Sequence, residues 1–153
     1  MNKLLVFFLL FHLHIANVYS DIIKPNTKIE PYNVVEIQLI SLKNNDKPDK
    51  DFGIEQTWEF AHPENKINTG PLNNFKKMLK NEIYSILLNH KDHKIEEIYN
   101  NKKIAIYDVI ILGSDNFYYE FKWQVERYDG KGSLNNCWLT TAVSNPVSLG
   151  ASI

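Results

Sequence analysis

Residues 58–79 have the sequence WEFAHPENKINTGPLNNFKKML, in which residues that end or start helices alternate with apolar residues. A short helix from about Ile54 is predicted to end at His62, because Pro63 disfavours helical geometry in the residue before it. Pro71 predicts the start of another helix, since proline is tolerated in the first turn. The helical spacing of the apolar residues that follow predicts an inner face made of Leu72, Phe75 and Leu79.

A longer helix is predicted before this stretch, from Pro31 to about Asn44. Its apolar residues recur three or four positions apart and form the stripe Tyr32, Val35, Leu39 and Leu42. The polar residues 64–68 predict a link between two helices. Residues 84–88 predict one further helical turn.

From His90 the spacing of apolar residues changes from about 3.6 to about 2, which indicates a sheet. Strands are predicted over residues 94–99, 102–112, 117–126 and 137–144. The alternation is clearest in the third, where one face consists of Phe117, Tyr119, Phe121, Trp123 and Val125. Helices first and an antiparallel meander afterwards predict an α+β domain, with the N-terminal helices packed on one face of the sheet.

Length and composition predict one folded domain. The chain has 153 residues, of which 44% are hydrophobic, and its formal net charge is −1. This size suits a single core. No basic stripe or patch is present, so nucleic acid is not an expected partner.

The predicted organisation is a signal peptide over residues 1–20, a loose polar lead-in over 21–30, the domain over 31–145 and a C-terminal tail over 146–153. Cys137 is the only cysteine, so no internal disulfide can form, and we expect it to be buried.

The N-terminus has the pattern of a secretory signal. Lys3 is followed by an apolar run from Leu4 to Ile15, interrupted by two histidines, and the small residues Val18 and Ser20 stand three and one positions before the expected cut. We therefore expect cleavage after Ser20 and export to a periplasm or a secretory compartment. The alternative is an uncleaved anchor, but a membrane span needs about 20 apolar residues and this run is shorter. No stable membrane anchor is expected after cleavage.

Several short sequence motifs resemble those of the domain-of-unknown-function family 4864, which is similar in fold to the nuclear-transport-factor-2-like cone. They cover most of residues 31–143 and are Leu42 to Asp46, Phe60-Ala61-His62-Pro63 with Asn65, Thr69-Gly70-Pro71 with Phe75, and Cys137-Trp138-Leu139-Thr140. Two positions depart from the family pattern, which has a serine where His62 stands and an acid where Thr141 stands.

The resemblance implies a cone, in which a strongly curved antiparallel sheet wraps a helix and leaves a pocket at its open end. Glycines 113, 130 and 132 are expected to let the sheet bend and turn. An aromatic wall on the concave side would line the pocket with large rigid surfaces. The predicted pocket residues are Trp58, Tyr107, Tyr119, Phe121, Trp123 and Trp138. The alternative is that these aromatic residues are ordinary core.

Two residues are candidates for a catalytic base. Asp108 shares a strand face with isoleucines, where desolvation would raise its pKa, and cone-fold isomerases use an acid in their cavity. The alternative places Asp108 at a bulge or strand rim. His62 has a suitable unperturbed pKa, but its place before Pro63 equally favours a structural role. Tyr107 or Tyr119 would donate a hydrogen bond in such an enzyme.

Metal and cofactor sites are not predicted. His90 and His93, with Asp92 between them, have no third ligand nearby and are expected in a solvent-exposed loop. No phosphate-binding loop, nucleophile elbow or zinc-protease motif occurs.

Three hypotheses remain for the function. They are an exported, non-enzymatic domain that binds a small apolar or amphipathic ligand, an isomerase- or lyase-like enzyme, and an interaction module that forms a homodimer through the outer sheet face.

Overall fold

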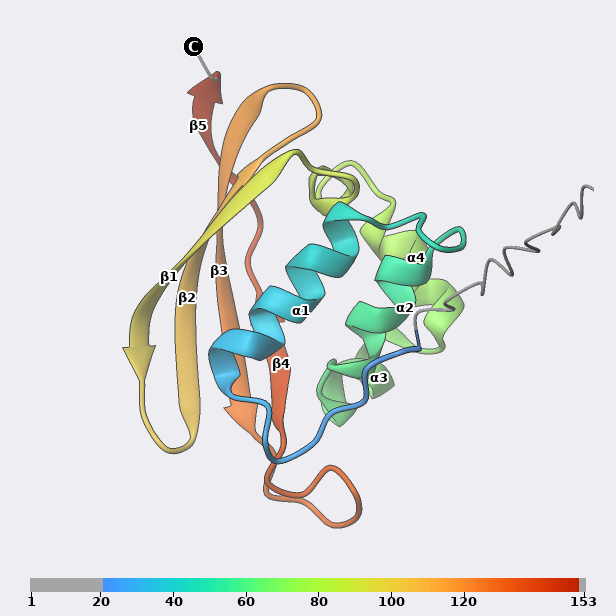
Figure 1. Ribbon diagram of the computed structural model, residues 1–153, viewed down its shortest axis with the longest axis vertical. Helices are drawn as coiled ribbons and strands as arrows, with labels where there is room; N and C mark the ends of the chain where they lie inside the picture. Colours follow the sequence, from blue (N-terminus) through green and yellow to red (C-terminus); the bar gives the residue numbers. More distant parts are fainter. Residues whose placement is uncertain (1–20, 152–153) are drawn as a thin grey trace, which may run out of the picture.

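The computed structural model describes residues 21–151 (Figure 1). The predicted signal peptide, its cleavage site and the last two residues lie outside the described residues. The described chain begins with helices α1 (Pro31–Lys43), α2 (Phe52–Glu59), α3 (Pro63–Thr69) and α4 (Leu72–Leu79), and a 3-10 turn η1 (Ser85–Leu87). Strands β1 (Asp92–Asn100), β2 (Ile104–Leu112), β3 (Phe117–Arg127), β4 (Trp138–Val143) and β5 (Val147–Ala151) follow. The predicted α+β class is therefore confirmed.

The strands form one antiparallel sheet with the order β1-β2-β3-β4, and β5 pairs with β3. Helix α1 crosses one face of this curved sheet, and α2, α3 and α4 lie beside it in the same layer (Figure 1). The expected packing of N-terminal helices on one sheet face is confirmed. None of the helices in residues 21–151 is long and apolar enough to span a membrane.

Bulges interrupt the pairing of the sheet at three places. They lie between Glu97 and Tyr99, between Tyr118 and Tyr119, and between Gln124 and Val125. A bulge adds a residue to one strand and increases its local twist. Glycines 113, 130 and 132 lie in the loops that connect the strands, so the expectation that they let the chain turn is confirmed, whereas the irregularities within the sheet are at the bulges.

Strands β4 and β5 follow one another along the same edge of β3. β4 pairs with residues 123–127 of β3, and β5 pairs with residues 117–120. Pro146 ends β4 as expected, since it has no N–H for the ladder. The prediction of a C-terminal tail is wrong for Val147–Ala151, which complete the sheet. Gly150 has φ 105° at the β5 bulge, a conformation that glycine adopts without strain.

Two connecting segments are more ordered than predicted. The polar residues 64–68 belong to α3, because Pro63 occupies its first turn as well as ending the preceding helix. The lead-in is attached to α2: the Ile23 N–H donates to Gln56 Oε1 at 2.7 Å, and Gln56 Nε2 donates to the Ile23 carbonyl at 2.8 Å. Lys24 and Glu59 add an ion pair at 2.9 Å. The expectation of a loose lead-in is therefore wrong.

The core lies between α1 and the sheet. The buried face of α1 includes Val34, Val35, Leu39 and Leu42, whereas Tyr32 is 41% exposed. On β3 the predicted inner row is confirmed for Phe121, Trp123 and Val125, which are at most 1% exposed, but Phe117 at the strand end is 41% exposed. The Cys137 thiol is buried as predicted, and desolvation raises its pKa.

Candidate ligand-binding cavity

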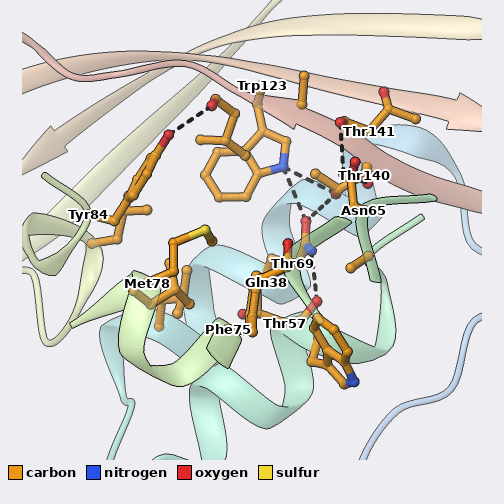
Figure 2. Close-up of a pocket in the computed structure, with 17 residues that line it drawn as sticks. Gln38, Thr57, Asn65, Thr69, Phe75, Met78, Tyr84, Trp123, Thr140 and Thr141 are labelled. Carbon is orange, nitrogen blue, oxygen red and sulfur yellow. Dashed lines mark hydrogen bonds between the residues drawn. The ribbon is translucent and has the colours of Figure 1, made fainter. Parts of the chain in front are cut away.

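A cavity of about 260 Å³ lies between the helical layer and the β4 side of the sheet (Figure 2). Helices α1 to α4, η1, β3 and β4 all contribute to its wall. The lining residues are Gln38, Leu42, Thr57, Trp58, Ala61, Asn65, Thr69, Phe75, Met78, Leu79, Tyr84, Leu87, Trp123, Thr140, Thr141, Ala142 and Val143.

The segment between α2 and α3 attaches the helices to β4 beside the cavity. Ala61 forms a parallel bridge with Thr140. The Thr140 N–H donates to the Phe60 carbonyl at 2.8 Å, and the His62 N–H donates to the Thr140 carbonyl at 2.9 Å. Because Pro63 forces the preceding residue out of helical geometry, this segment is extended and can pair like a strand. The motif Phe60–Pro63 thus has a structural role, because it attaches the helices to β4 beside the cavity.

Asn65 stabilises the β4 bulge at the cavity rim. Gln124 pairs with Ala142 and Val125 pairs with Thr140, so Thr141 is the extra residue of the bulge. Asn65 Nδ2 donates to the Thr140 carbonyl at 3.1 Å and to the Thr141 carbonyl at 2.7 Å. The bulge opens the regular ladder, and the amide of Asn65 replaces the pairing that the backbone loses.

A buried polar network forms one end of the cavity wall (Figure 2). Gln38 Oε1 accepts from Trp123 Nε1 at 3.1 Å and from the Thr140 hydroxyl at 2.6 Å. Gln38 Nε2 donates to the Thr57 carbonyl at 3.1 Å. A carbonyl can only accept and an indole N–H can only donate, so these partners determine the orientation of the Gln38 amide. The network connects α1, α2, β3 and β4.

The opposite wall is apolar and comes mainly from α4 and its surroundings. Phe75 packs against Trp58 with ring centroids 5.0 Å apart. Tyr84 extends over the cavity, and its hydroxyl donates to the Val143 carbonyl at 3.4 Å (Figure 2). Aliphatic and thioether side chains complete this wall, namely Leu42, Met78, Leu79 and Leu87. The cavity is therefore amphipathic, with a polar end and a larger apolar wall.

Only two of the six predicted pocket residues line the cavity, Trp58 and Trp123. Tyr107 and Phe121 are fully buried in the core. Tyr119 donates to Asp115 at 2.6 Å, and Trp138 lies beneath the Arg127 guanidinium, 5.6 Å from the ring centroid. The prediction that these four residues line the pocket is therefore wrong. Alternation predicts which face of the sheet a residue occupies, but not which part of that face borders a cavity.

Neither predicted catalytic base lies in the cavity wall. Asp108 alternates with the buried residues of β2, so it lies on the sheet face opposite the helices, and Lys122 Nζ contacts it at 2.6 Å. His62 is the N-cap of α3: its Nδ1 accepts from the Glu64 N–H at 3.2 Å. Its ring packs edge to face on Tyr128, with centroids 5.4 Å apart. The structural alternative left open for His62 describes that residue. Asp108 lies at neither a bulge nor a strand rim, but within β2 in a regular stretch of both ladders.

His90 and His93 form a hydrogen-bonded pair instead of a solvent-exposed loop. His90 is 2% exposed, and its Nδ1 lies 2.7 Å from the Leu87 carbonyl, to which it must donate. Its Nε2 lies 2.8 Å from His93 Nδ1, so it accepts from His93 when both rings are neutral. Burial lowers the pKa of His90 to about 4. Within residues 21–151, no three His, Cys, Asp or Glu residues are arranged to hold a metal ion.

The polar network was missed by sequence reasoning, although one signal pointed to it. Gln38 follows Val34 by four positions and Val35 by three, so it belongs to the buried face of the first helix. A polar residue at such a position needs a buried partner. Thr140, in contrast, occurs in an ordinary strand, and nothing in the sequence links it to Gln38.

Comparisons of the chain with protein-family models, with curated proteins and with solved structures found no match. The resemblance to family 4864 and to the nuclear-transport-factor-2-like superfamily therefore stays a prediction. The class that the structure defines is an α+β domain whose curved antiparallel sheet and helical layer enclose a cavity.

Proposed function

We propose that this protein binds a small, mostly apolar molecule in the cavity beside β4. The observation that carries the proposal is a space of about 260 Å³ with an apolar wall and a hydrogen-bonded polar network at one end. An apolar cavity of about 150 Å³ accepts benzene, and pockets for drug-sized ligands begin at about 300 Å³. A single ring with a short substituent, or a short chain, therefore fits best.

The composition of the wall favours binding over acid–base catalysis. Among the lining residues no carboxylate, imidazole, amine or thiol is present, and Tyr84 is the one titratable side chain. A general base must lie within hydrogen-bond reach of the proton that it removes. The isomerase or lyase hypothesis, with Asp108 or His62 as base, consequently has no geometric support at this cavity.

We also propose that the domain acts after export, with residues 1–20 removed. This rests on the basic start, the short apolar run and the small residues Val18 and Ser20 before the expected cut. A chain that starts at Asp21 retains the two Ile23 hydrogen bonds to Gln56 that attach the lead-in to α2. Mass spectrometry of the protein isolated from its source would test this, and a retained N-terminus would contradict it.

The homodimer hypothesis concerns the sheet face opposite the helices. That face of β2 carries the partly exposed side chains of Ile104, Ile106 and Ile110 around the Asp108–Lys122 ion pair. Size-exclusion chromatography with light scattering, on the wild type and on Ile106→Lys, would decide it. A wild-type monomer at high micromolar concentration would remove this alternative.

The binding proposal is tested by narrowing the cavity without disturbing the fold. Ethylbenzene is titrated into ¹⁵N-labelled protein, and shifts are expected at the amides of Thr140 and Leu79 and at the indole of Trp123. Thr69→Phe adds a ring at the rim of the cavity and should abolish these shifts. The matched control is Asn68→Phe on the exposed side of α3, which should leave them unchanged. Equal shifts in both variants, or shifts confined to the outer sheet face, would contradict the proposal.

A further inference from the structure

The cavity wall provides no formal charge for a ligand to pair with. All 17 lining residues are neutral side chains at physiological pH. An ion that enters such a site loses its hydration and gains no counter-charge, which is strongly unfavourable. An uncharged molecule is therefore the kind of ligand that this wall accommodates.

The hydrogen-bond inventory of Gln38 leaves one donor unused. Both lone pairs of Oε1 are occupied, by the Trp123 indole and the Thr140 hydroxyl. Nε2 has two N–H groups, and among the described residues it has one acceptor, the Thr57 carbonyl. The Thr140 hydroxyl proton is also in use, since it points to Gln38. The second N–H of Gln38 has no acceptor among the described residues, and Gln38 lines the cavity.

This donor is held in place before any ligand binds. Three hydrogen bonds from two strands and a neighbouring helix fix the plane of the amide, and Gln38 is 1% exposed. A preorganised donor loses little conformational freedom on binding. A ligand without an acceptor would displace water from this N–H and leave it unpaired, which lowers affinity.

We infer that the ligand is an uncharged molecule of about one ring that presents a hydrogen-bond acceptor, such as a carbonyl oxygen, to the free N–H of Gln38. This inference rests on the proposed function of the cavity. It divides the ligand into an apolar body, which packs against Phe75, Met78 and Leu79, and one polar group at the Gln38 end.

Four probes of nearly the same shape test the inference on the wild-type protein: acetophenone, α-methylstyrene, benzoate and benzamidine. Acetophenone carries the acceptor, α-methylstyrene replaces its oxygen by carbon, and the other two are charged. Acetophenone is expected to bind about tenfold more tightly than α-methylstyrene, the effect of one well-placed hydrogen bond. The charged probes should bind at least about 100-fold more weakly than acetophenone. Isothermal titration gives the affinities, and the Gln38 side-chain amide signals should shift more with acetophenone than with α-methylstyrene.

A variant assigns the preference to Gln38. Gln38→Met keeps the length of the side chain and removes the amide donor, so the preference for acetophenone over α-methylstyrene should fall well below tenfold. The matched control is Gln56→Met, at a buried amide that holds Ile23 and does not line the cavity, and it should retain the tenfold preference.

The outcomes separate this inference from the proposed function. Equal affinities of acetophenone and α-methylstyrene for the wild type would overturn the inference and leave the binding proposal intact. Benzoate or benzamidine binding as tightly as acetophenone would also overturn it. Absence of binding by all four probes would overturn both.

Discussion

The two sides of the inner sheet face differ in how they are filled. On β2 the inward residues Ala105, Tyr107, Val109 and Ile111 are fully buried, and none of them lines the cavity. On β4 residues 140–143 all border the cavity. Trp123 on β3 lies between the two sides, opposite Tyr107 in one ladder and Val143 in the other. The same sheet face is thus packed on one side and hollow on the other.

The cavity lies where side-chain volume is missing. The β4 side offers two threonines and an alanine, and α3 above it has no buried residues. The β2 side offers larger side chains beneath α1. A hollow forms where both layers are short of volume, and the Gln38 network keeps the layers from collapsing into it.

The sharpest test of the comparison removes one ring from each side. Phe121→Ala on the packed side should lower the free energy of unfolding by about 4 kcal/mol, because it creates a new cavity in a filled core. Phe75→Ala on the hollow side should cost about 2 kcal/mol, since its ring already borders empty space. Urea denaturation monitored by circular dichroism gives both values. Equal losses would show that the two sides are packed alike.

The next test measures whether water reaches the buried ring of His90, which lies just before β1. The pKa of His90 falls from 6.5 to about 4, mainly because burial disfavours its charged form, while His93 and Lys43 add to the lowering and Asp92 opposes it. The unfolded chain binds the proton more readily, so stability should be full above pH 6.5 and fall as the pH drops towards 4. The expected loss is about 3 kcal/mol.

Urea denaturation between pH 7.5 and pH 4 measures this loss. His90→Gln, whose amide can donate to the Leu87 carbonyl without titrating, should flatten most of the pH dependence. An NMR titration of His90 with a midpoint near 6.5 would show that water reaches the ring. It would contradict the claim that this side of the core excludes water.

A smaller effect is expected from exchanging a hydroxyl and a methyl group between the two sides. Val109→Thr places an unpartnered hydroxyl in the packed side and should cost about 2 kcal/mol. Thr140→Val removes the hydrogen bond that the hydroxyl donates to Gln38 Oε1 at 2.6 Å and the longer one that it accepts from Trp123 Nε1 at 3.3 Å. The Trp123 indole keeps Gln38 Oε1 as its acceptor, so the loss should be about 1 kcal/mol. Thermal unfolding followed by calorimetry can rank the pair. A larger loss for Thr140→Val would indicate that the network contributes more than packing.

The layers of the fold were predictable because their signals are local. Alternation placed Phe121, Trp123 and Val125 inward, and the helix limits at Pro31 and Pro63 follow from the geometry of proline itself. Strand β5 was missed because Pro146 indicates an end, whereas pairing with β3 depends on a distant partner. Its five residues are short and contain a glycine, so they carry little strand signal of their own.

The cavity could be predicted only in part. Trp58 and Trp123 were found because large aromatic residues mark an inner face. Gln38 and Thr140 lie 102 positions apart, and their 2.6 Å contact depends on how α1 crosses the sheet. Periodicity describes one element at a time, so it cannot locate a hollow that two layers leave between them.

The smallest effect on stability is expected for a substitution on the outer face of the sheet, opposite the helices. Asp108→Asn removes the charge from the ion pair with Lys122, whose side chain is 61% exposed. Water and salt screen such a pair, so the unfolding midpoint should not change measurably. Ethylbenzene binding should also be unchanged, because Asp108 lies on the opposite face from Trp123. A loss of binding in Asp108→Asn would mean that the two faces communicate through the sheet, and the hollow could not then be treated as a property of the β4 side alone.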